Sequence, residues 1–512
     1  MGRQGVSPPS GARPLPDLRP TELAAHAERR VNLVDAGVIE VANLVRRREV
    51  SAREVARAVI AHVEAVNPQL NALVGFDPQA VLDEADGLDQ ALARDPDRAS
   101  LAGAMASVKD NLWIEGRRSS QGSRLFADFI APRSALAVIR ARKAGAAMIG
   151  ASNCSEFACK GVTTNRIYGA TRNPWDLGRT TGGSSGGAAA AVAAGLGHFA
   201  ICTDGGGSTR RPASHTGVVG FKPSAGAIAH PDGFAEPVFG NSVIGLMARS
   251  VADVAAVFDA IGGPDVRDPL CLPMEATMPT GAALQRPFSA LRVAFSPRLG
   301  LDVAVDPDVR EALENAALGL GEAGVEVVDA DPAWPAGSSE SALMPLQLAG
   351  LANLYGEEFK RDPEQFDPDI AVQIEQGLSL SAADVARALL LREEMFRSLA
   401  AFFGEHDLLL SPTTPCVAWP LDELGPNTID GRDVSPRAHA VFTPAFNHVF
   451  MPACSVPIGL NRQGLPIGAQ IAGWRWRDRD VLRVAAQLES RAPAHFRRPL
   501  PMRPPSAKPV AA

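Results

Sequence analysis

The sequence is poor in cysteine, and its few cysteines follow no recognised pattern. Only six of the 512 residues are cysteine. They form no CxxC pair and no zinc spacing, and the separation of Cys154 and Cys159 matches no common metal site. This distribution predicts free, mostly buried thiols in the reducing cytoplasm. It argues against both a disulfide scaffold and a metal held by cysteines.

Long apolar runs and an excess of positive charge are also missing. No stretch of about 18 apolar residues is present to span a membrane, and the N-terminus lacks the apolar core of a secretion signal. The net charge is −7, so neither nucleic acid nor an anionic membrane is expected as a partner. The composition, 46% hydrophobic and 21% charged, is typical of soluble globular proteins.

The two ends of the chain differ in composition from the rest. Residues 1–30 are rich in proline, glycine and arginine, which predicts a disordered or loosely ordered N-terminal tail. Residues 501–512 have a similar composition and are predicted to be a C-terminal tail. The sequence between them shows no linker and no internal repeat, so we expect a single large domain over residues 31–500.

Helical and strand patterns alternate between the tails. Ser51 and Glu54 have the spacing of a capping box, and apolar residues at near-helical spacing follow them. The alanine-rich residues 187–196 predict a buried helix, and the segment HFAICTD after it predicts a strand that ends at Asp204. This alternation predicts an α/β sheet covered by helices on both faces. Residues 332–369 are the least regular and are expected to form a lid or a pocket wall.

A glycine-rich stretch from Gly182 to Ser208 is the most distinctive part of the sequence. It begins with GGSSGG and ends with TDGGGS. Glycines leave backbone N–H groups uncovered, and the amides of Gly205, Gly206 and Gly207 can converge on an atom near Ser208. Such convergence is the geometry of an oxyanion hole beside a nucleophile.

A serine nucleophile needs a base, and two residue types compete for that role. None of the nine histidines lies in a recognisable triad motif, and the G-x-S-x-G pattern is absent around Ser208. Lys109 ends an apolar strand, where burial would lower its pKa and allow it to act as a neutral base. A lysine next to Asp110 is also compatible with a simple ion pair. The residues alone leave both alternatives open.

Several motifs occur in a fixed order along the chain. LAGAMASVKDN, NPWDLGRTTGGSSGG, TDGGGSTRRPA and GVVGFKPS are followed by LLSPTTP and GLPIGAQIAG. In this order they resemble the amidase signature family of hydrolases, from about Val38 to about Glu489. The resemblance implies an α/β fold with a large mixed, mostly parallel β-sheet core that helices cover on both faces.

The resemblance also implies roles for the residues of the motifs. Ser208 matches the nucleophile, Lys109 matches the base, and Ser184 matches a serine that follows a cis peptide bond and relays protons between them. The backbone amides of Gly205, Gly206, Gly207 and Ser208 would form the oxyanion hole. Asp204 and Arg210 are expected to stabilise the nucleophile loop, and Asp110 to position Lys109.

Residues of the substrate pocket are harder to assign. The candidates are Ser185, Arg211, Phe126, Phe129 and Cys154. Ser185 would either help the relay or cap the alanine-rich helix. Arg211 replaces a residue that is commonly apolar in the family. It would either recognise an anionic or strongly polar acyl group or form an ion pair with an acidic residue. Aromatic residues in the variable segments favour an apolar pocket for aryl or alkyl amides.

Three functions follow from these expectations. The first is an amidohydrolase that cleaves a small amide through a Ser208 acyl-enzyme, with carbamates and esters as related substrates. The second is the glutamine-hydrolysing subunit of a tRNA-dependent amidotransferase, which shares the same core motifs. The third, a non-catalytic binding protein, is disfavoured because all three triad residues are present. No metal or organic cofactor is called for, and similar enzymes suggest a homodimer.

Overall fold

A computed structural model of the chain describes residues 32–95, 99–272, 280–288, 291–493 and 496. The chain divides into a unit of residues Met1–Asn32 and a unit of residues Leu33–Ala512. The predicted tails, 1–30 and 501–512, lie outside the described residues. Within the described ranges, no helix combines the length and apolar character that crossing a bilayer requires.

The second unit is built around one sheet of 11 strands. In order across the sheet, the strands are β1 (Leu73–Phe76), β3 (Ala147–Ser152), β2 (Met105–Lys109), β6 (Phe199–Asp204), β8 (Val243–Ala248), β7 (Val219–Lys222), β14 (Ala453–Leu460), β15 (Pro466–Gly473), β11 (Leu408–Pro412), β9 (Arg292–Phe295) and β10 (Glu326–Asp329). Two short hairpins, β4 (Arg172–Asn173) with β5 (Asp176–Thr180) and β12 (Thr428–Ile429) with β13 (Arg432–Asp433), lie outside it.

The sheet is mixed, as predicted, but it is less parallel than expected. Parallel pairing is confined to two blocks, β3–β2–β6 and β11–β9–β10, and all other neighbours are antiparallel. The expectation of a mostly parallel sheet therefore needs correction. The resemblance implied mostly parallel pairing, and the alternation of strands and helices along the sequence does not reveal strand direction. The β14–β15 hairpin, for example, turns back within a few residues.

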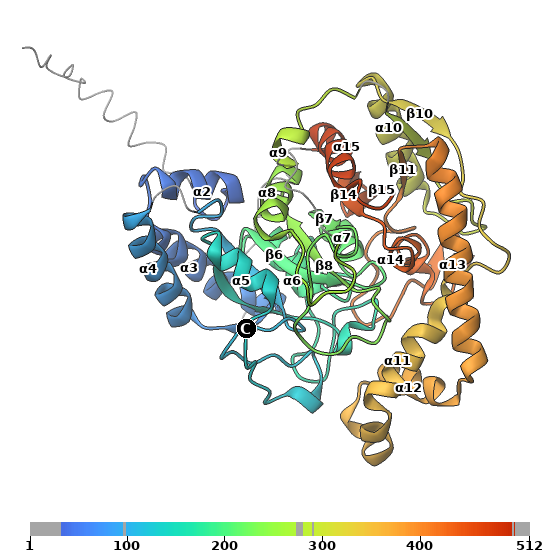
Figure 1. Ribbon diagram of the computed structural model, residues 1–512, viewed down its shortest axis with the longest axis horizontal. Helices are drawn as coiled ribbons and strands as arrows, with labels where there is room; N and C mark the ends of the chain where they lie inside the picture. The colour runs from blue at the N-terminus through green and yellow to red at the C-terminus, as the bar shows by residue number, and fades with distance from the viewer. Residues whose placement is uncertain (1–31, 96–98, 273–279, 289–290, 494–495, 497–512) are drawn as a thin grey trace, which may run out of the picture. The chain divides into compact units, whose positions relative to one another are not determined.

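Helices cover both faces of the sheet, as predicted (Figure 1). The α-helices are α2 (Val38–Arg46), α3 (Ala52–Leu70), α4 (Pro78–Arg94), α5 (Leu136–Lys143), α6 (Gly186–Ala193), α7 (Arg210–Thr216), α8 (Val251–Ile261), α9 (Thr280–Ala283), α10 (Pro307–Glu322), α11 (Glu340–Arg361), α12 (Pro368–Ser379), α13 (Ala382–Glu405), α14 (Pro444–His448) and α15 (Asp478–Arg491).

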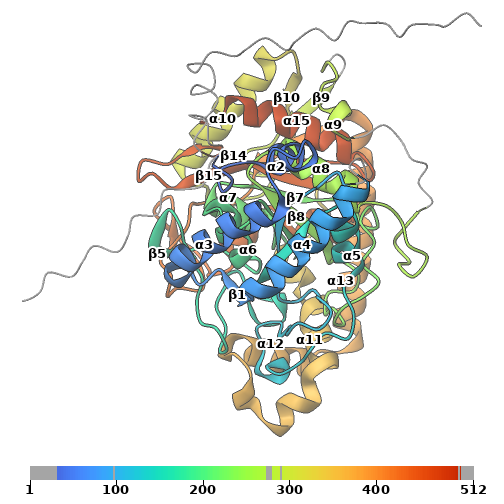
Figure 2. The ribbon, with the colours of Figure 1, turned by 90° about the vertical axis from the view of Figure 1, so that its left-hand side faces the viewer.

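Alternation along the central strand β6 shows how both faces are buried. Phe199 and Ile201 join a core with α5, α8 and α15, whereas Ala200 and Cys202 face α6 and α7. Successive side chains of a strand point to opposite faces, so a strand apolar throughout belongs between two helical layers. Figure 2 shows α3 and α4, which pack together, in front of the strands near the β1 edge.

A local signal explains where the helix α3 begins. Ser51 accepts the backbone N–H of Glu54, and Glu54 accepts the backbone N–H of Ser51, so the predicted capping box at the start of α3 is confirmed.

The segment 332–369 was expected to be irregular, but it contains the 22-residue helix α11. Pro345 within this helix obscures its pattern in the sequence, because proline usually disfavours a helix interior.

The helix α6 packs unusually close to the sheet. All eight residues are glycine, alanine or valine, and all are buried. The N–H of Gly187 donates to the carbonyl of Asn153 at 3.1 Å. A Cβ at Gly187 would lie 2.4 Å from Asn153 N, so only glycine fits there. This contact sets the position of the residues that lead into α6.

The close approach predicts that Gly187→Ala will destabilise the protein by about 1–3 kcal/mol, as overpacked core sites do. It should also lower activity, because the helix must move away from Asn153. Gly87 in α4 is the matched control, since a Cβ there meets nothing within 4 Å. Gly87→Ala should be neutral or stabilising by up to about 1 kcal/mol. Guanidinium unfolding midpoints of both variants test this, and equal effects would contradict the packing argument.

Candidate active site

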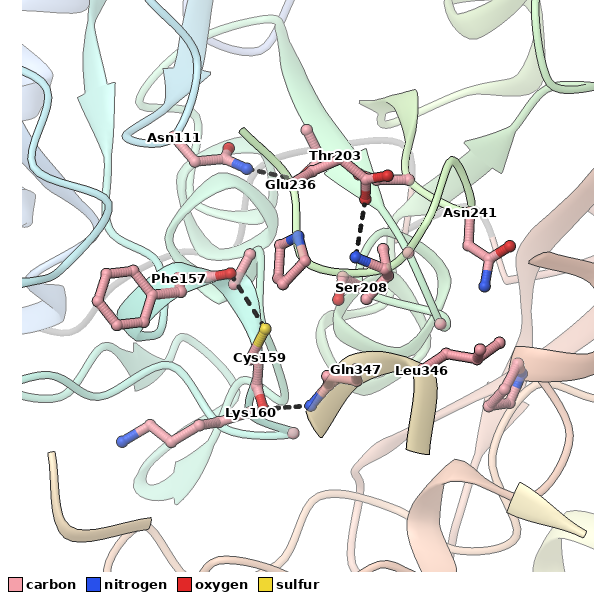
Figure 3. A pocket seen from close by; sticks show the side chains of 18 of the residues that line it. Asn111, Phe157, Cys159, Lys160, Thr203, Ser208, Glu236, Asn241, Leu346 and Gln347 are labelled. Atoms are coloured by element: carbon pink, nitrogen blue, oxygen red, sulfur yellow. Dashed lines mark hydrogen bonds between the residues drawn. The ribbon is translucent and has the colours of Figure 1, made fainter. Parts of the chain in front are cut away.

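Lys109 is the last residue of β2, and the neighbouring parallel strand β6 ends on the same side of the sheet. Its side chain is fully buried. The Nζ atom lies 2.8 Å from Ser184 Oγ and 3.0 Å from Thr203 Oγ1. Thr203 Oγ1 also accepts from Asn111 Nδ2 at 3.0 Å, as Figure 3 shows. Lys109 is thus held against a serine hydroxyl, and no carboxylate among the described residues forms an ion pair with it.

Burial lowers the pKa of Lys109, because a charged ammonium is poorly solvated in the interior. The nearby Cys154, Cys202 and Asp204 act in the opposite direction without outweighing burial. A lysine in this state releases its proton more readily than an exposed lysine does. Its neutral amine can then accept a proton from the neighbouring hydroxyl.

Ser184 and Ser185 lie in the loop that leads from β5 into α6. The Gly183–Ser184 peptide bond is cis, as the resemblance implied. Ser185 N–H donates to the carbonyl of Ser208 at 3.2 Å, and Ser185 Oγ donates to the carbonyl of Thr203 at 3.2 Å. These bonds tie the two ends of the glycine-rich stretch together, so that the loop of Ser184 lies against the loop of Ser208.

The carboxylate of Asp204 shapes the loop that carries Ser208. It accepts the backbone N–H of Gly207 at 2.7 Å, of Thr209 at 3.1 Å and of Arg210 at 3.3 Å. Gly207 has φ +112°, and a Cβ there would lie 2.0 Å from Thr443 Oγ1. Glycine at 207 therefore meets two requirements, a left-handed backbone and a close approach to α14.

Arg210 completes this arrangement from the start of α7. Its Nη2 and Nε donate to Asp204 at 2.9 and 3.1 Å, and both side chains are fully buried. Its Nη1 donates to Gln470 Oε1 at 2.6 Å and to the Thr443 carbonyl at 3.1 Å. Burial acts to raise the pKa of Asp204, but Arg210 and the hydrogen bonds outweigh it and hold this pKa below its ordinary value.

The expectation of four oxyanion-hole amides needs correction. Gly207 N–H already donates to Asp204 Oδ1, so this amide is not available to a substrate. Among the described residues, no hydrogen-bond partner is found for the amides of Gly205, Gly206 and Ser208. Gly206 also has open space where a Cβ would stand. Three amides therefore remain as candidates to hold an oxyanion near Ser208.

Ser208 opens into a pocket whose walls come from distant parts of the chain. Four variable segments contribute to these walls. They supply Gln121; His230, Phe234 to Val238, Asn241 and Ser242; Met344, Leu346 and Gln347; and Pro444 with His448. Figure 3 shows Ser208, Glu236, Cys159 and Gln347 around the cavity.

Other wall residues were not anticipated from the sequence. They are Asn111, Phe157, Ala158, Cys159, Lys160, Gly161, Glu340, Leu343, Arg437 and His439. The segment from Phe157 to Gly161 begins inside the motif GASNCSEFA, residues 150–158, and that overlap was the available signal. Glu340 and Arg437 pair with each other at 3.0 Å across almost a hundred residues, which no local pattern could predict.

Of the five residues proposed for the substrate pocket, only Arg211 lines it. Phe126 and Phe129 lie behind the wall, with ring centroids 4.9 and 5.1 Å from that of Phe234. Cys154 is fully buried, and Ser185 is committed to the Thr203 carbonyl. Phe126, Phe129, Cys154 and Ser185 therefore do not line this pocket. For the two phenylalanines the reason is that a variable aromatic segment does not reveal which of its rings reaches the cavity.

The histidines that competed for the role of base have other surroundings. His198 Nδ1 accepts the N–H of Met105 at 2.9 Å, and His448 Nδ1 lies 2.8 Å from Asn241 Nδ2. Burial lowers the pKa of His215 and of His439. Within the described ranges no histidine hydrogen-bonds to Ser208, and no cluster of His, Cys, Asp and Glu could hold a metal ion.

Asp110 fixes the loop after Lys109. Its carboxylate accepts the backbone N–H of Ser120 at 3.1 Å and also the Ser120 hydroxyl, and its carbonyl accepts the N–H of Gln121 at 3.1 Å. Burial raises the pKa of Asp110 to about 6, although the bonds from Ser120 act to lower it. These contacts fit the expected positioning role.

Most of the chain matches one known protein family. A family model described as Amidase matches residues 54–482. The chain belongs to the amidase signature family. It is therefore related to enzymes that hydrolyse amides, and the predicted fold class agrees with the solved structures of this family.

Three relatives illustrate the range of this family. An acylamidase of Rhodococcus erythropolis is 36% identical over 471 residues, covering 91% of this chain and 98% of the relative. One subunit of the glutamyl-tRNA(Gln) amidotransferase of Moorella thermoacetica is 34% identical, covering 90% and 97%. The crystal structure of a bacterial aryl acylamidase superposes with a TM-score of 0.84 at 28% identity, covering 91% and 100%.

The buried ion pair of Asp204 and Arg210 predicts that Asp204→Asn strongly destabilises the folded protein. Removing one partner of a buried ion pair costs about 3–5 kcal/mol, because the other charge stays buried. The pKa of Asp204 is lower in the folded than in the unfolded protein. Its ionised carboxylate therefore stabilises the wild type above the unfolded pKa of about 4, and this contribution is lost as the pH falls through the folded pKa. Asp204→Asn should lack that acid-dependent part. Unfolding at pH 7 and at lower pH measures both, and unchanged stability at pH 7 would contradict the argument.

Proposed function

We propose that this protein is an acylamidase-type hydrolase that cleaves a small amide through an acyl-enzyme on Ser208. One observation carries the proposal. Nζ of the buried Lys109, whose pKa is lowered, lies 2.8 Å from Ser184 Oγ. The loop of Ser184 is joined to that of Ser208 by the hydrogen bond from the Ser185 N–H to the Ser208 carbonyl. A base, a relay and a nucleophile in this order match the chemistry that an amide requires.

The proposed mechanism begins with proton transfer. Neutral Lys109 takes the proton of Ser184, and Ser184 takes the proton of Ser208 as its oxygen attacks the amide carbon. The carbonyl oxygen becomes an oxyanion, which the free amides of the glycine loop hold. When the tetrahedral intermediate collapses, Ser184 gives a proton to the leaving nitrogen and regains one from protonated Lys109, which becomes neutral again. Water then hydrolyses the ester on Ser208, giving a carboxylic acid and restoring the enzyme.

The pocket walls support an aryl or alkyl group in the substrate. Phe157, Phe234 and Leu346 are among the apolar residues that line it. The relatives point the same way, since they include an acylamidase and an aryl acylamidase. Carbamates and esters present a similar carbonyl to the same nucleophile and are proposed as secondary substrates.

A second candidate function is glutamine hydrolysis within an amidotransferase. The glutamyl-tRNA(Gln) amidotransferase subunit of Moorella thermoacetica matches 90% of this chain and favours this alternative. An activity panel of anilides, aliphatic amides, carbamates, esters and glutamine separates the two. Glutamine turnover that exceeds anilide turnover, and that rises when partner subunits co-purify, would replace the first proposal with the second.

The acyl-enzyme predicts the effect of removing the nucleophile. Ser208→Ala should reduce kcat/KM for an anilide on the order of 10⁴-fold or more without loss of folding. A slow ester substrate should add its acyl mass to the wild type only, as intact-protein mass spectrometry would show. Ser107→Ala is the control, because its buried hydroxyl has no hydrogen-bond partner. It should keep near-normal activity, whereas normal activity in Ser208→Ala would refute the nucleophile assignment.

The relay predicts how activity depends on pH. Because Lys109 acts as a neutral amine, kcat/KM should rise with pH through a pKa below 10.5 and fall at acid pH, where the lysine is protonated. Lys109→Arg should abolish activity, since a guanidinium keeps its proton. Lys222 is another fully buried lysine, with its pKa lowered by burial to about 7. Lys222→Met should still lose kcat/KM at acid pH. If the variant no longer shows this loss, protonation of Lys109 is not its cause.

A further inference from the structure

Arg211 is a cation in the pocket that the proposed mechanism does not use. It stands in the first turn of α7, three residues after Ser208, and lines the same pocket. Only 7% of its surface is exposed. A guanidinium as buried as this normally has an anionic partner, because desolvation of an isolated charge is costly.

The contacts of Arg211 are made with neutral groups only. Its Nε donates to the Gly207 carbonyl at 3.4 Å, and its Nη1 lies 3.3 Å from His439 Nδ1. Among the described residues, no aspartate or glutamate oxygen lies within 4.0 Å of it. The alternative that Arg211 forms an ion pair with an acidic residue is therefore wrong for the described part of the chain.

The other charged residues of the pocket wall are already satisfied. Arg437 Nε donates to both carboxylate oxygens of Glu340 at 3.0 Å. Lys160 binds Asp367 at 2.7 Å, and Figure 3 shows its side chain extending away from the other labelled residues. Glu340 and Asp367 are therefore each paired with another cation and do not balance the charge of Arg211.

The carboxylate of Glu236 is also engaged within its own loop. It accepts the backbone N–H of Val238 at 3.4 Å and that of Gly240. Burial raises its pKa, which favours the neutral acid over the anion. The pocket thus keeps one positive charge, on Arg211, without a counter-ion from its described walls.

The position of Arg211 is defined by its neighbour His439. The His439 ring lies over Trp419, with centroids 4.8 Å apart. It also lies where a Cβ of Gly161 would stand, 2.1 Å from the ring, so the glycine makes room for it. Burial and the adjacent Arg211 lower the pKa of His439 well below its usual value. A neutral histidine can accept from Arg211 Nη1 and hold the guanidinium in place.

Burial and the nearby Arg437 lower the pKa of Arg211 to about 10, so it stays protonated at neutral pH. A ligand carboxylate would offset the cost of this charge, and a guanidinium fork suits a carboxylate with two parallel hydrogen bonds.

We propose that Arg211 binds a carboxylate of the substrate, so that the enzyme prefers small amides that carry a free carboxyl group. This inference rests on the proposed amide hydrolysis at Ser208. The apolar wall, with Phe157, Phe234 and Leu346, would contact the hydrocarbon part between the carboxylate and the scissile amide. Hydrolysis of such an amide by water releases an amine and, when the carboxylate is on the acyl side, a dicarboxylic acid.

The kinetic test compares two anilides that differ in one charged group. Succinic acid mono-p-nitroanilide carries a carboxylate, and butyric acid p-nitroanilide is its neutral counterpart. The wild type should prefer the first in kcat/KM, and Arg211→Met should lower that preference by about 10- to 100-fold, mainly by losing activity on the charged substrate. Arg211→Lys should keep part of it. A wild type that shows no preference in this pair or in the leaving-group pair described next, or an equal loss on both members of each pair in Arg211→Met, would overturn the proposal.

A second pair of substrates locates the carboxylate relative to the amide. 4-Acetamidobenzoate and acetanilide differ by a carboxylate on the leaving-group side. An Arg211-dependent preference in either pair supports the proposal and assigns the side. Thermal unfolding of each variant shows whether a kinetic loss reflects misfolding, and Arg211→Lys gives a second variant if Arg211→Met does not fold.

A binding experiment separates this inference from the proposed function. In the Ser208→Ala background, calorimetry measures binding of succinic acid mono-p-nitroanilide and of its butyric counterpart without turnover. Tighter binding of the charged ligand that Arg211→Met weakens by about 10-fold or more supports the carboxylate subsite even if the wild type hydrolyses no amide. Equal binding of the charged and neutral members, both in this pair and in the pair of 4-acetamidobenzoate and acetanilide, overturns the subsite even if the wild type is an active amidase.

Discussion

The buried ion pair of Asp204 and Arg210 is the interaction on which the rest of the site depends. Asp204 ends β6 and accepts three backbone N–H groups of the nucleophile loop, while Arg210 extends to Gln470 on β15 and to the Thr443 carbonyl next to α14. The loop is therefore shaped by one carboxylate and anchored to parts of the chain more than 200 residues away. Such a pair gives little net stability, but it leaves few alternative loop conformations, because any other would strand a buried charge.

Close packing of small residues supplies the second constraint. Gly187 brings α6 against Asn153, and the Ser185 amide then meets the carbonyl of Ser208. Lys109 is enclosed by these layers, and its burial lowers its pKa. In the proposed mechanism the same packing both positions the relay and prepares the base, since burial of the Lys109 side chain favours the neutral amine.

The pocket adds specificity to this common core. Its walls come from segments that are far apart in the sequence. Acidic residues pair with Lys160 and Arg437, and backbone N–H groups bind Glu236, whereas Arg211 has no acidic partner among the described residues. In many enzyme folds, variable loops surround a fixed arrangement of chemistry, because binding residues on loops can change without disturbing the scaffold. In the pocket wall, the unpaired guanidinium of Arg211 favours amides that carry a carboxylate in the proposal above.

Local features could be predicted from the sequence: the capping box at Ser51, the apolar strand that ends at Lys109 and the ordered motifs that place the chain in its family. These depend on residues close in sequence. Only the tertiary structure decided that Gly207 donates to Asp204, that Phe126 lies behind Phe234, and how the strands are directed. It also decided that Arg211 meets no acid among the described residues. Each of these depends on which distant segments pack together, and neither spacing nor composition records that.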